Sequence, residues 1–111
     1  MNTVASTPEG KVKADIKTLL KQLPNCWWFM PVSTGHGVHG IPDFIVCYCG
    51  FFVAIEAKKP GGKAGTTPLQ KMQIRGIEMA HGRAIVADNV EEVRQLFADM
   101  AAAVARQGLA V

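Results

Sequence analysis

Apolar residues recur every three or four positions between Glu9 and Leu23, which is the spacing of one face of an α-helix. We expect a helix over this range, ended by Pro24. Glu9 falls within the angular range of the apolar stripe and would point toward the body of the domain. A carboxylate there either interacts favourably with the helix dipole or has a partner inside the domain, and the geometry favours neither. The opposite flank of the helix carries lysines, at Lys13, Lys17 and Lys21.

Four further stretches have the β-branched and aromatic composition of strands. The ranges 44–49 and 51–57 are interrupted only by Gly50, which predicts a β-hairpin. Further strands are expected over 27–32 and 83–88. Trp27 and Trp28 are adjacent, so they would face opposite sides of the sheet, one toward the core and one toward solvent, a partner or DNA.

Two more helices are predicted from their first turns. Thr67, Pro68 and Gln70 stand at the cap, first and third positions of a helix that runs to about His81. Asn89 caps a final amphipathic helix. The order α-β-β-β-α-β-α predicts an α/β fold with a mixed sheet flanked by helices. We expect one domain over residues 1–111, in which 1–8 form a loose leader.

Composition and charge narrow the function classes. The chain has a net charge of +3 and a pI of about 8.9, which permits nucleic-acid binding without requiring it. Its start lacks a signal peptide and its longest apolar run is too short to span a membrane, so we expect a cytoplasmic protein. Three cysteines without a CxxC pair favour reduced thiols over disulfides or zinc. The glycine-rich loop over 59–66 lacks the P-loop order, so no nucleotide cofactor is expected.

The predicted hairpin gathers charged groups at one edge of the sheet. An antiparallel return would bring Asp43 beside the end of the second strand. Glu56 and Lys58 are two residues apart on that strand, so they project from the same side. Two carboxylates and a lysine suit Mg²⁺ or Mn²⁺ and a water to be activated. The alternative is an ion pair at a sheet end, although Glu56 ends an otherwise apolar run where a charge is costly.

These residues resemble a known family. Gly40-Ile41-Pro42-Asp43, Glu56-Ala57-Lys58 and Thr67-Pro68-Leu69-Gln70 are similar, in order and spacing, to the motifs of the stand-alone phage-type VRR-NUC (virus-type replication-repair nuclease) domain of the PD-(D/E)xK nucleases. The resemblance implies a restriction-endonuclease-like α-β-β-β-α-β core followed by a C-terminal helix. It also implies a homodimeric, metal-dependent endonuclease that cuts four-way (Holliday) junctions in a bacterial or phage-infected cell. A flap or splayed-arm nuclease, or a non-cleaving module that binds branched DNA, is the alternative.

The resemblance also assigns roles to residues. The metal ligands would be Asp43, Glu56, the Ala57 carbonyl and Glu9, and Lys58 would orient or deprotonate the attacking water. Gln70 would line the site, although its position in the sequence equally predicts a helix cap. Basic and glycine-rich segments beside the site would contact DNA, or would simply be solvated, through Lys13, Lys17, His36, His39, Lys59 and Lys63.

Overall fold

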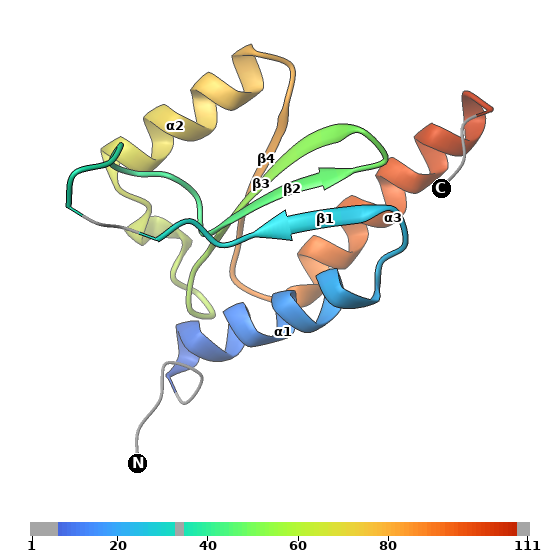
Figure 1. Cartoon of the computed structure of the whole chain (residues 1–111). Coiled ribbons are helices and arrows are strands. Elements are labelled where there is room, and N and C mark those ends of the chain that lie inside the picture. Colours follow the sequence, from blue (N-terminus) through green and yellow to red (C-terminus); the bar gives the residue numbers. More distant parts are fainter. Residues whose placement is uncertain (1–6, 33–34, 109–111) are drawn as a thin grey trace.

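The computed structural model describes residues 7–32 and 35–108 (Figure 1). Its elements follow the predicted order, with a short 3₁₀ turn added after the third strand. They are α1 (Pro8–Gln22), β1 (Cys26–Phe29), β2 (Phe44–Tyr48), β3 (Phe51–Ala57), η2 (Lys63–Gly65), α2 (Pro68–Met79), β4 (Arg83–Ala87) and α3 (Val90–Arg106). The predicted α/β class, with helices flanking a mixed sheet and a helix at the C-terminal side, is therefore confirmed.

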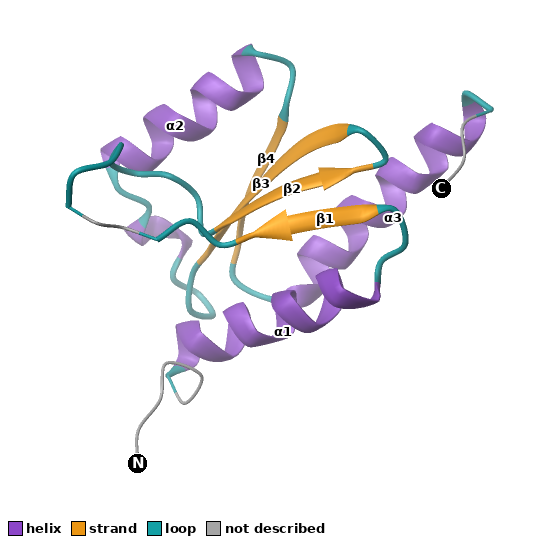
Figure 2. Ribbon diagram, in the orientation of Figure 1, coloured by secondary structure: helices purple, strands orange, loops and turns teal. Residues whose placement is uncertain are grey.

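The sheet has four strands in the order β1-β2-β3-β4 (Figure 2). The pairs β1–β2 and β2–β3 are antiparallel, and β4 runs parallel to β3. Phe44 pairs with Ile55, so the start of β2 lies beside the end of β3, as the hairpin predicted. Ala57 pairs with Ala87 at the same edge. The residues that precede β2 therefore lie close to those that follow β3 and β4, at the same end of the strands.

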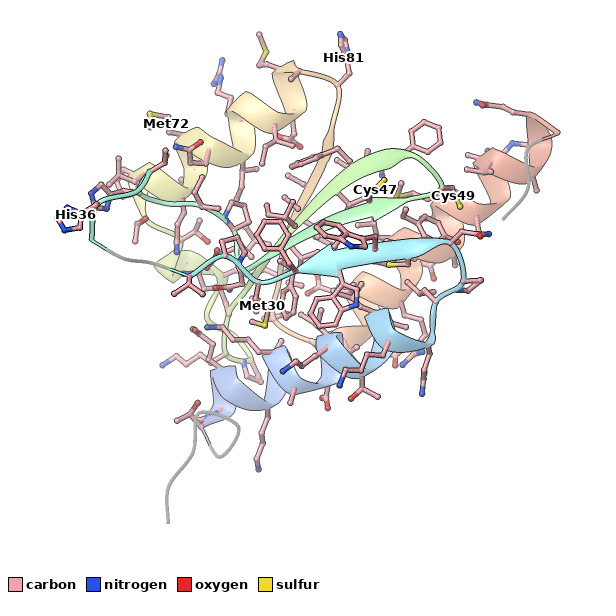
Figure 3. The ribbon with its side chains drawn as sticks, in the orientation of Figure 1. Met30, His36, Cys47, Cys49, Met72 and His81 are labelled. Carbon is pink, nitrogen blue, oxygen red and sulfur yellow. The ribbon has the colours of Figure 1, made fainter. Side chains whose placement is uncertain are left out.

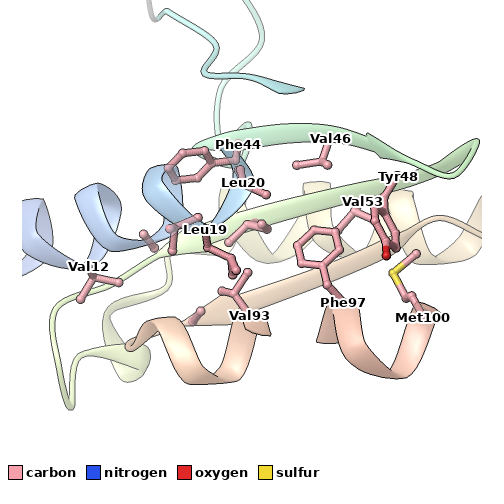
Figure 4. Packing of buried hydrophobic residues seen from close by; sticks show 14 residues of the cluster. Val12, Leu19, Leu20, Phe44, Val46, Tyr48, Val53, Val93, Phe97 and Met100 are labelled. Carbon is pink, nitrogen blue, oxygen red and sulfur yellow. The ribbon is translucent and has the colours of Figure 1, made fainter. Parts of the chain in front are cut away.

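The hydrophobic core lies between one face of the sheet and the helices α1 and α3 (Figure 4). Phe97 of α3 packs edge-on against Tyr48 of β2, with ring centroids 5.0 Å apart. The helix α2 contacts β4 on the other side of the sheet, away from that core (Figure 1). The sheet is thus covered by two helices on one face and by one helix on the other. None of the helices in the described ranges is long and apolar enough to cross a bilayer.

Side-chain caps fix where the helices begin. The Thr7 hydroxyl accepts from the Gly10 amide at 2.9 Å, and Pro8 is the first residue of α1. The prediction that the loose leader extends to residue 8 is therefore wrong, because Thr7 and Pro8 form the same start signal as Thr67 and Pro68. The rest of that leader, residues 1–6, lies outside the described residues.

The glycine-rich loop over 59–66 is fastened to the start of α3. The Gly61 amide donates to Asp88 Oδ2 at 2.9 Å, and Lys63 forms an ion pair with Glu92. The Thr66 hydroxyl, which is buried, donates to the Lys63 carbonyl at 2.7 Å. These contacts give the loop a defined path, although it is rich in glycine.

Candidate active site

Asp43 is held at the sheet edge by the strand beside it. The Ala57 amide donates to Asp43 Oδ2 at 2.9 Å. Asp43 immediately precedes β2 and Ala57 ends β3, so this bond closes the open end of the hairpin. It also fixes one carboxylate oxygen and leaves Oδ1 to face the charged groups around it.

Glu56 lies next to this pair on β3 and is buried, with only 4% of its surface exposed. Its Oε1 atom has no hydrogen-bond partner among the described residues. Burial, and then the negative charge of Asp43, raise the pKa of Glu56 to about 7, against the lowering effect of Lys58 and Lys13. The two lysines therefore offset only part of the cost of burying this charge, and Oε1 has no donor among the described residues.

Lys58 projects from the same side of the chain as Glu56, as predicted. Its Nζ lies 3.6 Å from Glu56 Oε2. The ammonium also donates to Gln70 Oε1 at 2.9 Å and to the Gly65 carbonyl at 3.4 Å. The Lys58 amide donates to the Ala87 carbonyl at 2.8 Å, which anchors the backbone at the end of the parallel strand pair.

Gln70 caps its helix, as its position predicted, and its side chain also contacts Lys58 and Glu56. Its Oε1 accepts from the Thr67 amide at 2.9 Å, which completes the capping box of α2. The same oxygen accepts from Lys58, and Nε2 donates to Glu56 Oε2 at 3.0 Å. One amide therefore caps a helix and bridges the carboxylate and the ammonium of the candidate site.

Gly40 brings the segment before Asp43 against the first turn of α2. A Cβ atom at Gly40 would lie 2.5 Å from the carbonyl carbon of Leu69, and the Gly40 φ is +79°. Only glycine combines this close approach with a left-handed backbone. The Gln73 side chain, which the sequence did not single out, donates to the His39 carbonyl at 3.2 Å and ties the same two segments.

The first helix contributes Glu9 and, unexpectedly, Lys13. Lys13 Nζ lies 3.3 Å from Glu9 Oε2 and 3.6 Å from Asp43 Oδ1. The prediction that Lys13 lies on the outer flank is wrong, because its long side chain reaches past the helix rim into the site. The i,i+4 spacing of Glu9 and Lys13 was the signal that could have revealed the ion pair. Glu9 stays at the rim, with 44% of its side chain exposed.

The other candidates for DNA contact lie at the surface. Lys17, Lys59, His36 and His39 are exposed, and Figure 3 shows His36 at the outer end of its loop. The Lys63 side chain is partly exposed, but its ammonium is paired with Glu92. The structure therefore brings Asp43, Glu56, Lys58 and Gln70 together and leaves the proposed DNA contacts spread over the neighbouring surface.

The carboxylate oxygens of Asp43 and Glu56 are suitable ligands for a hard divalent cation. Within 7–32 and 35–108, no three acidic, histidine or cysteine side chains are gathered closely enough to hold a metal ion. The unpartnered Glu56 Oε1 and the Asp43 Oδ1 are, however, the carboxylate oxygens that Mg²⁺ and Mn²⁺ prefer. A cation near them would offset the negative charge of Asp43, which contributes to the raised pKa of Glu56.

The site offers two kinds of group for chemistry: carboxylates that could bind a cation, and the Lys58 ammonium, which could bind an anion or a water. The Gln70 side-chain amide orients Lys58 and Glu56. These groups come from two segments of the chain, the β2–β3 hairpin and the start of α2.

No protein-family model matches the chain, and no curated protein or solved structure matches it. The assignment of a function therefore rests on the site and on its sequence motifs.

Proposed function

We propose that the chain is a metal-dependent endonuclease that hydrolyses phosphodiester bonds in branched DNA. The observation that carries this proposal is the buried Glu56 carboxylate, which has one unpartnered oxygen and a pKa raised to about 7 beside Asp43. Perturbed carboxylates of this kind gather at functional sites, because a buried charge without a partner destabilises a fold. The motif resemblance selects phosphodiester hydrolysis among the reactions that such a site supports.

In this proposal, Asp43 and Glu56 hold Mg²⁺ or Mn²⁺ through carboxylate oxygens, with the Ala57 carbonyl and, directly or through water, Glu9. The cation supplies charge neutralisation at the phosphate and activation of a water. Lys58, whose Nζ donates to Gln70 Oε1 at 2.9 Å, would as an ammonium orient that water or contact the phosphate, and would as a neutral amine help to deprotonate the water. Gln70 itself acts by positioning both Lys58 and Glu56.

The leading substrate is a four-way junction, cut by a homodimer. A junction has two strands to cut in an approximate twofold relation, and a C₂ dimer presents two sites in that relation. The sheet face opposite the core offers an apolar surface for the contact, which we name the outer sheet face: Trp27, Phe29, Cys47 and Phe52. The Trp27 and Phe29 rings are tilted against each other with centroids 5.6 Å apart, and Trp27, Cys47 and Phe52 are successive partners across three strands.

Exposure supports this use of the outer sheet face. Trp27 is 65% exposed, whereas Trp28 on the other face packs against Phe44 with ring centroids 6.1 Å apart. Phe29 and Phe52 are exposed as well. Contiguous exposed aromatic groups mark interfaces more often than solvated surface. A second copy of the chain is the proposed occupant.

The proposed setting is the cytoplasm of a bacterial or phage-infected cell. Such a cell holds DNA in a reducing compartment, and the three cysteines of the chain are free thiols. Exposed basic side chains, such as Lys17 and Lys59, would contact phosphates.

A cleavage panel tests the proposal. The full chain is incubated with Mg²⁺ or Mn²⁺ and with four-way junction, flap, splayed-arm and linear duplex DNA. Preferential paired nicking of the junction supports the resolvase activity, and cleavage of flaps or splayed arms alone selects the alternative nuclease. Tight binding of branched DNA without any cleavage, with either metal, would select a non-cleaving module and refute the enzyme.

A further inference from the structure

Lys13 lies where its charge acts on every carboxylate of the site. Its ammonium stands between Glu9 and Asp43, at 3.3 Å from Glu9 Oε2 and 3.6 Å from Asp43 Oδ1. The backbone holds the other Asp43 oxygen through the Ala57 amide. Lys13 therefore contacts the Asp43 oxygen that remains open to a cation.

The surroundings explain why an ammonium is held there. Asp43 and Glu9 raise the pKa of Lys13, although burial, the largest single influence, acts to lower it. Lys13 in turn lowers the pKa of Glu56, which Asp43 and Glu9 raise. One positive charge thus offsets part of the repulsion among the carboxylates of Glu9, Asp43 and Glu56.

We propose that Lys13 is a built-in counter-ion, which bridges Glu9 and Asp43 in the metal-free protein and is displaced when a divalent cation binds. This inference rests on the proposed metal site. An ammonium and a divalent cation compete for the same carboxylate oxygens, and two positive charges at that separation repel each other. The wild-type protein therefore binds metal more weakly than its carboxylates alone would allow.

The side chain is suited to leave without unfolding its helix. About a quarter of it, 25%, is exposed, so the ammonium has a route to solvent. A lysine stem is flexible, and its rotation leaves the backbone of α1 and the core residues Val12 and Ile16 undisturbed.

Calorimetric titration of Mn²⁺ into the full chain, without DNA, tests the competition. We expect Lys13→Gln to bind Mn²⁺ about tenfold more tightly than the wild type, within the usual range of coupling between two ligands. Lys13→Arg keeps the positive charge and should not gain affinity. Lys21→Gln removes an exposed lysine from the same helix and should bind like the wild type.

Amine labelling of the wild-type protein, read by mass spectrometry, follows the displacement itself. Without metal, Lys13 should react more slowly than Lys21, because its ammonium is paired and partly buried. Mn²⁺ should raise the labelling rate of Lys13 and leave that of Lys21 unchanged.

The outcomes separate this inference from the proposed function. Equal Mn²⁺ affinity in the wild type and Lys13→Gln, or Lys13 labelling that does not respond to Mn²⁺, would overturn the counter-ion role. If the wild type binds Mn²⁺ and Asp43→Asn does not, the metal site stands even where the role of Lys13 fails. If neither the wild type nor Lys13→Gln binds Mn²⁺, both the metal site and the inference are wrong.

Discussion

Gln70 and Glu56 are joined by a hydrogen bond in which Gln70 Nε2 donates to Glu56 Oε2 over 3.0 Å. The oxygen of the same amide accepts from the Thr67 amide and from the Lys58 ammonium. The first turn of α2 and the candidate site therefore share one side chain. A change in this side chain should therefore disturb both the first turn and the positions of Lys58 and Glu56.

This link predicts that Gln70→Ala has two effects. It should lower the free energy of unfolding by about 1 kcal/mol through the lost cap. It should also lower cleavage by about tenfold or more, because Lys58 and Glu56 lose their common partner. Denaturation and single-turnover cleavage measure the two effects separately.

Thr67→Ala is the matched control for that variant. It removes the hydroxyl that accepts from the Gln70 amide at 3.1 Å but keeps the contacts of the Gln70 side chain. Its stability should fall by a similar amount while cleavage stays near the wild-type rate. An equal loss of cleavage in both variants would mean that the turn, and not the Gln70 amide, matters.

Glu56 predicts a specific dependence of stability on pH in the metal-free protein. Its pKa is raised from 4.5 to about 7, so the folded state binds this proton more tightly than the unfolded chain. The resulting stabilisation is fully present below pH 4.5 and is lost as the pH rises through about 7. It amounts to about 3 kcal/mol, from the linkage between a pKa shift and free energy.

Urea denaturation of the wild type and of Glu56→Gln, both in EDTA, isolates the contribution of Glu56 to the free energy of unfolding. The stability of the wild type relative to the variant should fall across the window from 4.5 to about 7 and level off above it. A difference that does not change with pH would show that Glu56 titrates normally in the fold.

Gly40→Ala should destabilise the fold through two independent strains. The new Cβ would lie 2.5 Å from the carbonyl carbon of Leu69, and the φ of +79° disfavours a side chain. We expect a loss of about 2–3 kcal/mol in thermal unfolding. Gly37→Ala is the control, because nothing lies within 4 Å of its Cβ position, and its effect should stay below about 1 kcal/mol. Equal stability of the two variants would refute the close approach.

The proposed dimer predicts a mass of about twice 12.0 kDa in light scattering at micromolar concentration. Trp27→Glu should dissociate it, because the substitution introduces a charge into the outer sheet face. Met79→Glu alters an apolar residue that is 73% exposed at the end of α2 and should leave the dimer intact. A wild-type monomer would argue against the dimer and in favour of flap cleavage.

Features encoded by neighbouring residues could be predicted from the sequence. The Thr67 cap and the hairpin around Gly50 depend on local hydrogen bonds and on the alternation of side chains along a strand. The same alternation correctly placed Glu56 and Lys58 on one side. The start of α1 at Thr7 and Pro8 was equally local, and its signal was overlooked.

Contacts between distant segments could not be predicted in the same way. The angular position of Lys13 on a helix does not specify where a flexible side chain ends, which depends on Asp43 lying opposite. The ion pair of Lys63 with Glu92 likewise depends on the path of the 59–66 loop, and the glycines of that loop permit many backbone conformations. The double role of Gln70 emerges only when the start of α2 packs beside the hairpin.

The most direct test of the account compares the wild type with Asp43→Asn in the cleavage of a four-way junction. The substitution keeps an oxygen that can accept from the Ala57 amide, so the fold should persist while a negative charge is lost. We predict paired nicks by the wild type with Mg²⁺ and none in EDTA, and junction binding without cleavage by Asp43→Asn. Turnover by Asp43→Asn at the wild-type rate, or wild-type cleavage that EDTA does not reduce, would contradict the account.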